Sequence, residues 1–172
     1  MNNNQLSMLF KRTMITLNRG NELFNFRIAG VALNDNYVLL HKAEVDTFWT
    51  CPGGRAEIGE TASQTLVREM KEELGVDVEV VRLLWLVENF FDYAQKDYHE
   101  IAFYFLMQFP RRSRYLAKDK SFQGIEDDNH LKFQWFPVDS DVLTKLPLLP
   151  SFLQQSLNNL PNSVEHIVES KN

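Results

Sequence analysis

Cysteine is almost missing from this sequence, because Cys51 is the single thiol among 172 residues. A disulfide within the chain is therefore excluded, which is typical of proteins in a reducing cytosol. Long apolar runs are missing as well: "LLWLV" is among the longest, and a membrane helix needs about 20 apolar residues. The start, "MNNNQLSMLFKR", is too polar for a secretory signal peptide. We predict a soluble, cytoplasmic protein without a membrane partner.

Positive charge is also in short supply. The chain has 18 Lys and Arg against 23 Asp and Glu, a formal net charge of −5. This balance argues against binding to a nucleic-acid backbone, which needs a basic surface. One local exception is "RRSR" at residues 111–114. It is either a solvated loop or a basic rim that attracts an anionic substrate.

Repeats, linkers and low-complexity segments are absent, and the length suits one domain. Apolar residues make up 44% of the chain, which is enough for a core. We expect an N-terminal extension at 1–22 that packs on the domain, and a single domain at 23–160 that includes a C-terminal helix. A polar tail at 161–172 is expected to fray.

Extended segments are predicted where β-branched and aromatic residues concentrate between turn signals. They are 23–33, 37–43, one or two strands within 76–91, 98–109 and 131–138. A closing helix is predicted after Pro150. Mixed strands with helices between and after them indicate the α/β class, or α+β, with a mixed sheet.

One helix is strongly marked between these strands. Thr61 is a good N-cap, Gln64 completes a capping box, and Gly75 is placed just past the helix end. Helical spacing predicts that one stripe of the helix is buried. That stripe consists of Leu66, Val67, Met70 and Leu74.

The same helix carries Glu69, Glu72 and Glu73, at positions i, i+3 and i+4. Such positions are neighbours on a helix, where like charges cost a few tenths of a kcal/mol per pair. Arg68 can offset only part of this charge, and Glu60 adds to it just before the helix. Either this is a solvated acidic face, or it is a site for Mg²⁺, which prefers oxygen ligands together with substrate phosphates.

These residues resemble the Nudix box, Gx5Ex7REUxEExGU, where U is a bulky aliphatic residue. Gly54 opens the pattern, Glu60 follows, and "REMKEELGV" at 68–76 completes it, so that every fixed position is filled. At typical residue usage, a chance match is on the order of 10⁻⁷ to 10⁻⁶. The sequence is therefore identified as similar to the Nudix family.

The resemblance implies an α/β/α sandwich around a mixed sheet. It also implies cleavage of a phosphoanhydride bond in a nucleoside diphosphate linked to another group, with Mg²⁺ or Mn²⁺. In the matching positions, Glu69, Glu72 and Glu73 would bind the metal, and the Gly54 carbonyl would contribute. Arg68 and Glu60 would orient these ligands. The catalytic set would be Glu69, Glu72 and Arg68, with Glu69 the first candidate for the general base.

Outside the box the assignments are more open. Glu126 lies in a loop where relatives often carry an extra metal ligand, and Asp127 and Asp128 compete for that role. A plain acidic surface loop is the other interpretation.

Three further residues are candidates for substrate binding. Glu100 lies in an apolar strand, as a substrate or metal contact or as a strand end exposed to water. Arg27 either binds phosphate bidentately or forms a structural ion pair. Tyr93, 17 residues past the box, matches a tyrosine of dinucleoside polyphosphate hydrolases, although aromatic residues crowd this region.

The substrate stays open among nucleoside triphosphates, nucleotide sugars and dinucleoside polyphosphates. The alternative function is a catalytically silent Nudix-like module that senses a nucleotide. The complete set of box glutamates favours the enzyme. The expected partner is a small nucleotide-type molecule, and a homodimer is possible because homodimers are common in the family.

Overall fold

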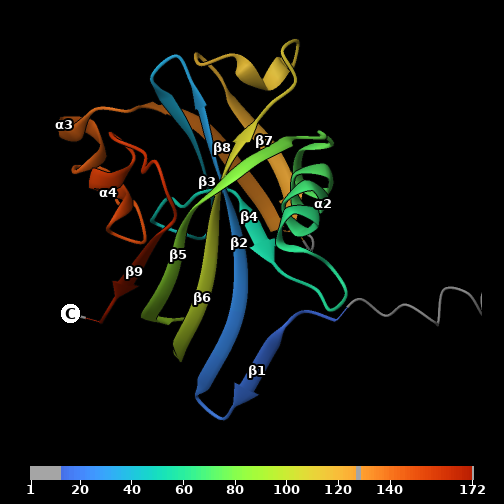
Figure 1. Ribbon diagram of the computed structural model, residues 1–172, viewed down its shortest axis with the longest axis vertical. Helices are drawn as coiled ribbons and strands as arrows, with labels where there is room; N and C mark the ends of the chain where they lie inside the picture. The colour runs from blue at the N-terminus through green and yellow to red at the C-terminus, as the bar shows by residue number, and fades with distance from the viewer. Residues whose placement is uncertain (1–12, 127–128, 172) are drawn as a thin grey trace, which may run out of the picture.

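The computed structural model describes residues 13–126 and 129–171, with the side chains of Glu126 and Asn129 outside that description. Within these residues, nine strands form one mixed sheet in the order β7-β8-β3-β2-β6-β5-β9, with β1 and β4 paired to β2 (Figure 1). The strands are β1 (Thr16–Arg19), β2 (Glu22–Asn34), β3 (Tyr37–Ala43), β4 (Gly53–Arg55), β5 (Glu79–Tyr93), β6 (Lys96–Gln108), β7 (Ser121–Glu126), β8 (Asn129–Pro137) and β9 (Glu165–Glu169). The helices are α2 (Ala62–Leu74), α3 (Ser140–Leu143) and α4 (Leu153–Ser156), with a 3₁₀ turn η1 (Arg114–Leu116).

Strand β2 organises the sheet because it pairs with four other strands. It runs parallel to β6, from Glu22 opposite Asp97 to Ala32 opposite Met107. On its other side it pairs antiparallel with β1 and β4, and its end pairs with β3. The short strand β4 is thereby fixed beside the middle of β2. The predicted extended segments are confirmed, and the segment predicted at 76–91 forms one long strand, β5, at 79–93.

Helix α2 has the predicted ends. Thr61 and Gln64 form both hydrogen bonds of the capping box, and Gly75 takes the left-handed conformation at φ 69°. These local hydrogen bonds satisfy backbone groups that have no partner within the helix at its ends. The expected stripe is buried at Leu66, Met70 and Leu74, whereas Val67 is only partly buried.

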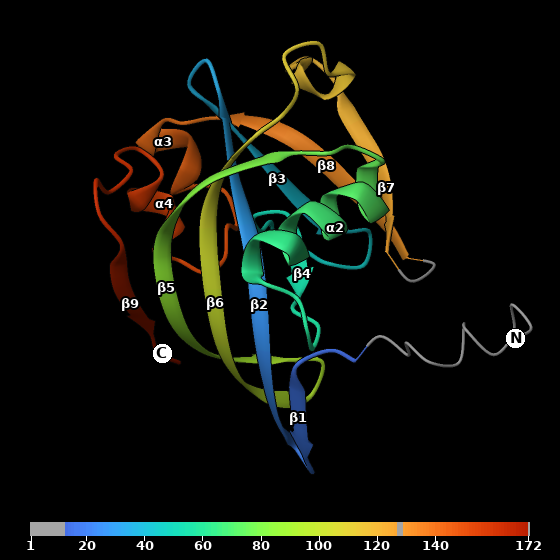
Figure 2. The ribbon, with the colours of Figure 1, turned by 45° about the vertical axis from the view of Figure 1, so that its right-hand side comes forward.

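The sheet has a separate core on each face, with α2 over one and α3 and α4 over the other (Figure 2). Alternation along β2 separates them, since Ile28 belongs to the α2 core and Ala29 to the opposite one. The helices on both faces and the mixed sheet confirm the predicted fold class. By the same alternation, Asn25 and Arg27 lie on the face opposite α2.

The C-terminal region differs from the prediction. The expected closing helix is reduced to the four residues of α4, ahead of Asn158 and Asn159, which favour turns over helix interiors. The expected frayed tail was wrong, because β9 pairs in parallel with β5 along Trp85–Asn89. Glu169 anchors the strand by accepting hydrogen bonds from Ser151 Oγ and Phe152 N, both 2.9 Å long.

The N-terminal extension is partly described. β1 pairs with β2, so its residues are an integral part of the sheet, while residues 1–12 lie outside the description. In the described part of the chain, no helix is both long and apolar enough to cross a membrane. The "RRSR" segment leads into η1, where the Arg114 guanidinium lies 4.9 Å from the centre of the Tyr115 ring.

Candidate active site

A glycine in β4 forms the floor of the acidic site. A Cβ atom placed on Gly54 would lie 2.3 Å from both Cδ and Oε1 of Glu69, so this carboxylate rests directly against the Gly54 backbone. The preceding Gly53 has φ 138°, and a Cβ there would lie 2.1 Å from the Ile28 carbonyl oxygen. Only glycine fits at either position. The "GG" pair thus lets strand and helix approach closely enough to bring β4 and Glu69 together.

Arg68 lies at the centre of the acidic residues. Its guanidinium donates to Glu60 through Nε and Nη2 (2.8 and 3.1 Å), to Glu69 (2.8 Å) and to Glu72 (3.1 Å). It also lies 3.8 Å from a carboxylate oxygen of Glu57. The Arg68 side chain is only 13% exposed. A single cation therefore faces four carboxylates, a local excess of negative charge.

The pKa values in this group reflect that arrangement. Desolvation acts against the charge of Glu60, but hydrogen bonds from Arg68 and Thr65 outweigh it and lower the pKa of this carboxyl. Desolvation likewise opposes the charge of Arg68, and its bonds to Glu60 and Glu69 outweigh that effect and raise the pKa of the guanidinium. Both groups are ionised at neutral pH.

The metal-ligand candidates are gathered on α2, but they do not surround one point. Glu69 and Glu73 are buried and Glu72 is partly exposed. Among the described residues, no three His, Cys, Asp or Glu side chains stand together as a metal centre. Two of the candidates, Glu69 and Glu72, instead bind Arg68. Glu126 ends β7, and its side chain lies outside the description together with Asp127 and Asp128.

Arg27 extends from β2 toward the loop that precedes β4. Its Nη2 donates to the carbonyl oxygens of Cys51 (3.3 Å) and Gly53 (3.2 Å). Cys51 is a buried filler as predicted, and burial raises the pKa of its thiol to about 12. The structure thus places Arg27 on the backbone of the loop.

Glu100 is buried, so the interpretation as a water-exposed strand end was wrong. It is 6% exposed and accepts a hydrogen bond of 2.9 Å from Asn25 Nδ2 on the neighbouring strand. Among the described groups, the Oδ1 atom of Asn25 is buried without a hydrogen-bond partner. This buried polar pair lies on the same face as Arg27.

Tyr93 belongs to an aromatic cluster, which we define as Phe48, Phe91, Tyr93 and Tyr98. The Tyr93 hydroxyl donates to Asp46 Oδ1 at 2.9 Å, and its ring meets Phe48 edge-on at 6.0 Å between centroids. Phe91 stacks on Tyr98 at 4.8 Å. The Tyr93–Asp46 bond joins the end of β5 to the loop before β4. With Tyr93 38% exposed, a ring at this site can stack on a ligand.

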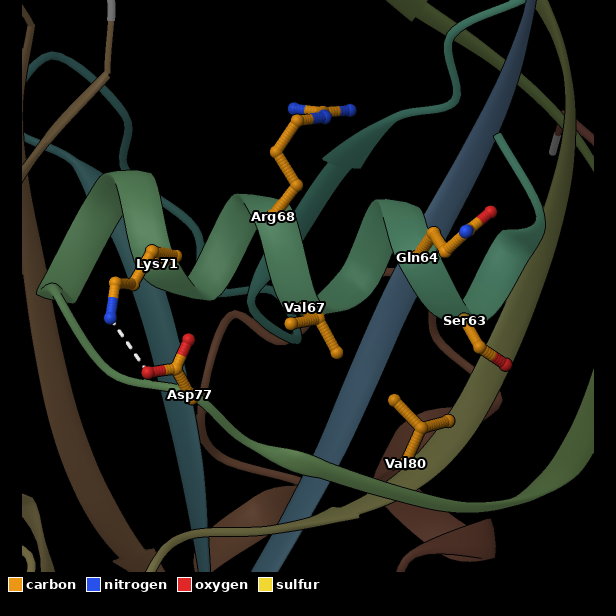
Figure 3. A pocket seen from close by; sticks show the side chains of 7 residues that line it. All are labelled: Ser63, Gln64, Val67, Arg68, Lys71, Asp77 and Val80. Atoms are coloured by element: carbon orange, nitrogen blue, oxygen red, sulfur yellow. Dashed lines mark hydrogen bonds and ion pairs between the residues drawn. The ribbon is translucent and has the colours of Figure 1, made fainter. Parts of the chain in front are cut away.

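A groove of about 430 Å³ lies on the other flank of α2 (Figure 3). Val67 and Val80 line it, and the Lys71–Asp77 ion pair (2.6 Å) lies beside them. Arg68 also lines the groove, and Figure 3 shows its side chain pointing away from Val80. None of the box glutamates lines this groove, so we place the site on the Gly54 side of the helix.

The sequence interpretation missed three residues of these groups. Glu57 was not assigned to the site, and the structure places it beside Arg68. Its position between Gly54 and Glu60 was the available signal. Asn25 could have been inferred from its alternation with Arg27. No sequence signal pairs Asp46 with Tyr93, because 46 residues separate them.

Comparisons with known proteins identify the family. The NUDIX domain family matches residues 24–153, three quarters of the chain. The putative ADP-ribose pyrophosphatase YjhB of Bacillus subtilis (strain 168) is 37% identical over 62 residues, 36% of this chain and 30% of that protein. The uncharacterized Nudix hydrolase YvcI of the same organism is 27% identical over 120 residues, 70% of this chain and 69% of YvcI. The chain spans only 25% to 45% of the length of three curated relatives.

Solved structures show the same fold at low sequence identity. A mutator MutT protein of Bacillus halodurans superposes with a TM-score of 0.61 at 19% identity, over 86% of this chain and 90% of the other. A MutT Nudix hydrolase of Burkholderia pseudomallei gives 0.57 at 24% identity, over 76% and 95%. The box, the fold and the domain match all agree, and the chain belongs to the Nudix family.

Proposed function

We propose that this protein is a divalent-metal-dependent pyrophosphohydrolase. It cleaves a phosphoanhydride bond in a nucleoside diphosphate linked to another group. The observation that carries the proposal is the gathering of four carboxylates around one guanidinium beside the bare backbone of Gly54. Such an excess of negative charge repels a diphosphate, and it becomes favourable once hard cations are bound.

The donor set fits Mg²⁺ or Mn²⁺. Glu69, Glu72 and Glu73 offer carboxylate oxygens from one helix, and Gly54 offers a carbonyl without a side chain in the way. The carboxylates now bound to Arg68 have to turn toward a shared ion. A bound ion neutralises charge on the phosphates and lowers the pKa of coordinated water.

The side chains of the protein then have separate tasks. Arg68, held by Glu60, keeps the box glutamates apart and oriented. Replacing a residue that orients metal ligands changes metal affinity by about 10- to 100-fold. Glu69 is the first candidate to accept the proton of the attacking water. Buried against Gly54, it is held in a fixed position, as a general base requires.

Hydrolysis in Mg²⁺ is the experiment that tests this function. Nucleoside triphosphates, nucleotide sugars, ADP-ribose and dinucleoside polyphosphates are supplied in turn, in oxygen-18 water, and products are analysed by mass spectrometry. We expect metal-dependent release of a nucleotide from at least one class, lost with EDTA and restored by Mg²⁺ or Mn²⁺. The labelled product identifies the phosphorus that is attacked. Tight nucleotide binding without turnover would support the silent sensing module instead.

The aromatic cluster is our candidate for the nucleoside subsite. Replacing Tyr93 by alanine should raise KM about 10-fold with little change in kcat, because base stacking on an aromatic ring contributes about 1–3 kcal/mol. Replacing Tyr93 by phenylalanine keeps the ring and removes only the bond to Asp46, so KM should stay within about threefold of wild type. Steady-state kinetics on both variants test this, and an unchanged KM in the alanine variant would contradict it.

A further inference from the structure

Strand β2 holds three consecutive carbonyl groups of the loop that leads into the Nudix box. The carbonyls of Cys51 and Gly53 accept hydrogen bonds from the Arg27 side chain, at 3.3 and 3.2 Å. The carbonyl between them, of Pro52, accepts from the backbone N–H of Gly30 at 2.8 Å. One side chain and one backbone group of β2 therefore fix the path of the loop.

This loop in turn determines where the Glu69 carboxylate can lie. Gly53 is packed so closely on β2 that a Cβ would meet the Ile28 carbonyl, and Gly54 supports Glu69 directly. A shift of the Gly53–Gly54 backbone by a few tenths of an ångström would be transmitted to Glu69. Geometric precision at this scale matters for metal ligands and catalytic groups.

Arg27 is partly buried, and its charge lies close to the same loop. Burial first, and the nearby Arg27 charge second, lower the pKa of His41 to about 3. His41 is therefore neutral at physiological pH, so it adds no positive charge beside Arg27. Arg27 Nη2 donates to the carbonyls of both Cys51 and Gly53, so both carbonyl dipoles face the same end of the guanidinium.

We propose that Arg27 is a positioning residue of the metal site, which acts through the Cys51–Gly54 backbone and Glu69. The inference rests on the proposed function. The role it gives Arg27 is different from direct contact with a substrate phosphate. A direct contact would change substrate binding. A positioning role changes metal affinity and the dynamics of the loop before any substrate is present.

The test compares Arg27→Met and Arg27→Lys with Arg82→Met in the full-length protein. Arg82 Nη2 also donates to a backbone carbonyl, that of Pro161 at 2.6 Å, and is a matched control outside the site. Mn²⁺ affinity of the substrate-free protein is measured by electron paramagnetic resonance, and amide exchange of residues 50–56 by mass spectrometry. The lysine variant retains the charge and replaces the planar guanidinium with an ammonium on a shorter side chain, which keeps the test valid if the methionine variant does not fold.

In both Arg27 variants, we expect Mn²⁺ affinity to fall about 10-fold or more. A loss of about 10-fold is the lower end of the range observed when residues that orient metal ligands are replaced. Exchange in 50–56 should rise, kcat should fall, and KM should change less than about twofold. Arg82→Met should match wild type in Mn²⁺ affinity and in exchange of that segment. Unchanged Mn²⁺ affinity and exchange, with a raised KM, would overturn the inference in favour of phosphate contact.

Failure of the proposed function is a separate outcome. If the wild-type protein hydrolyses no substrate of the panel, the exchange measurement still decides the role of Arg27. Faster exchange of 50–56 in both Arg27 variants, and not in Arg82→Met, would support the positioning role. Unchanged exchange would overturn it.

Discussion

Replacing Glu72 by glutamine is expected to lower kcat by about 10³-fold, a loss of about 4 kcal/mol of transition-state stabilisation. Glutamine keeps the size of the side chain and can still accept a hydrogen bond from Arg68, but it loses the negative charge that a hard cation requires. Because the Glu72 side chain is 38% exposed, the fold should tolerate the change. The measurement is kcat at saturating substrate and Mg²⁺, together with the thermal unfolding midpoint.

The matched control is Glu165→Gln in β9, which removes an exposed carboxylate away from α2. It should leave kcat within about twofold of wild type, because surface charges far from a site act weakly across solvent at physiological salt. If Glu72→Gln turned over its substrate at nearly the wild-type rate, the assignment of Glu72 as a metal ligand would be wrong. A lower unfolding midpoint in that variant alone would point to a structural role.

The features that sequence predicted well are local in the chain. Thr61, Gln64 and Gly75 fix the ends of α2 through bonds that span three to six residues, and the box pattern lies within one turn-and-helix unit. Such short-range interactions depend little on the rest of the fold. This is why the helix and its caps agree with the structure.

The features that sequence could not predict depend on distant partners. β9 forms because β5 presents an open edge some 80 residues earlier in the chain, and nothing in "VEHIVE" specifies that edge. The same holds for Arg27 and Glu100. They lie in different strands, and only the assembled sheet shows that loop carbonyls accept hydrogen bonds from Arg27 and that Glu100 accepts one from Asn25.

Arg68 should dominate the stability of the metal-free protein. Arg68→Met removes the cation from the centre of Glu57, Glu60, Glu69 and Glu72, and leaves poorly hydrated carboxylates facing one another. Breaking a buried ion pair on one side costs about 3–5 kcal/mol, and partial exposure of Glu60 favours the lower end. For a chain of this size, about 3 kcal/mol corresponds to a fall of roughly 6–12 °C in the unfolding midpoint. Calorimetry in EDTA at pH 7 measures this change.

The pH dependence of that loss follows from Glu60. Its pKa is lowered in the folded protein, so its stabilising effect is present above the ordinary glutamate pKa of about 4.3 and is lost as pH falls through the folded value. The wild type and Arg68→Met should therefore differ most at neutral pH and converge in acid. Equal differences at pH 7 and at acid pH would show that Arg68 stabilises by packing of its aliphatic stem instead.

Added Mg²⁺ should compensate for the missing guanidinium. An ion that binds only the folded state at 100 times its Kd adds about 2.7 kcal/mol. Without Arg68, Glu69 and Glu72 lose the guanidinium that holds them away from that ion, so the midpoint of Arg68→Met should rise more with Mg²⁺ than that of wild type. NaCl at equal ionic strength separates binding from charge screening. A smaller rise of the unfolding midpoint in the variant than in wild type would contradict this expectation. It would mean that Arg68 is required to hold the ligands in place and that Mg²⁺ does not replace its charge.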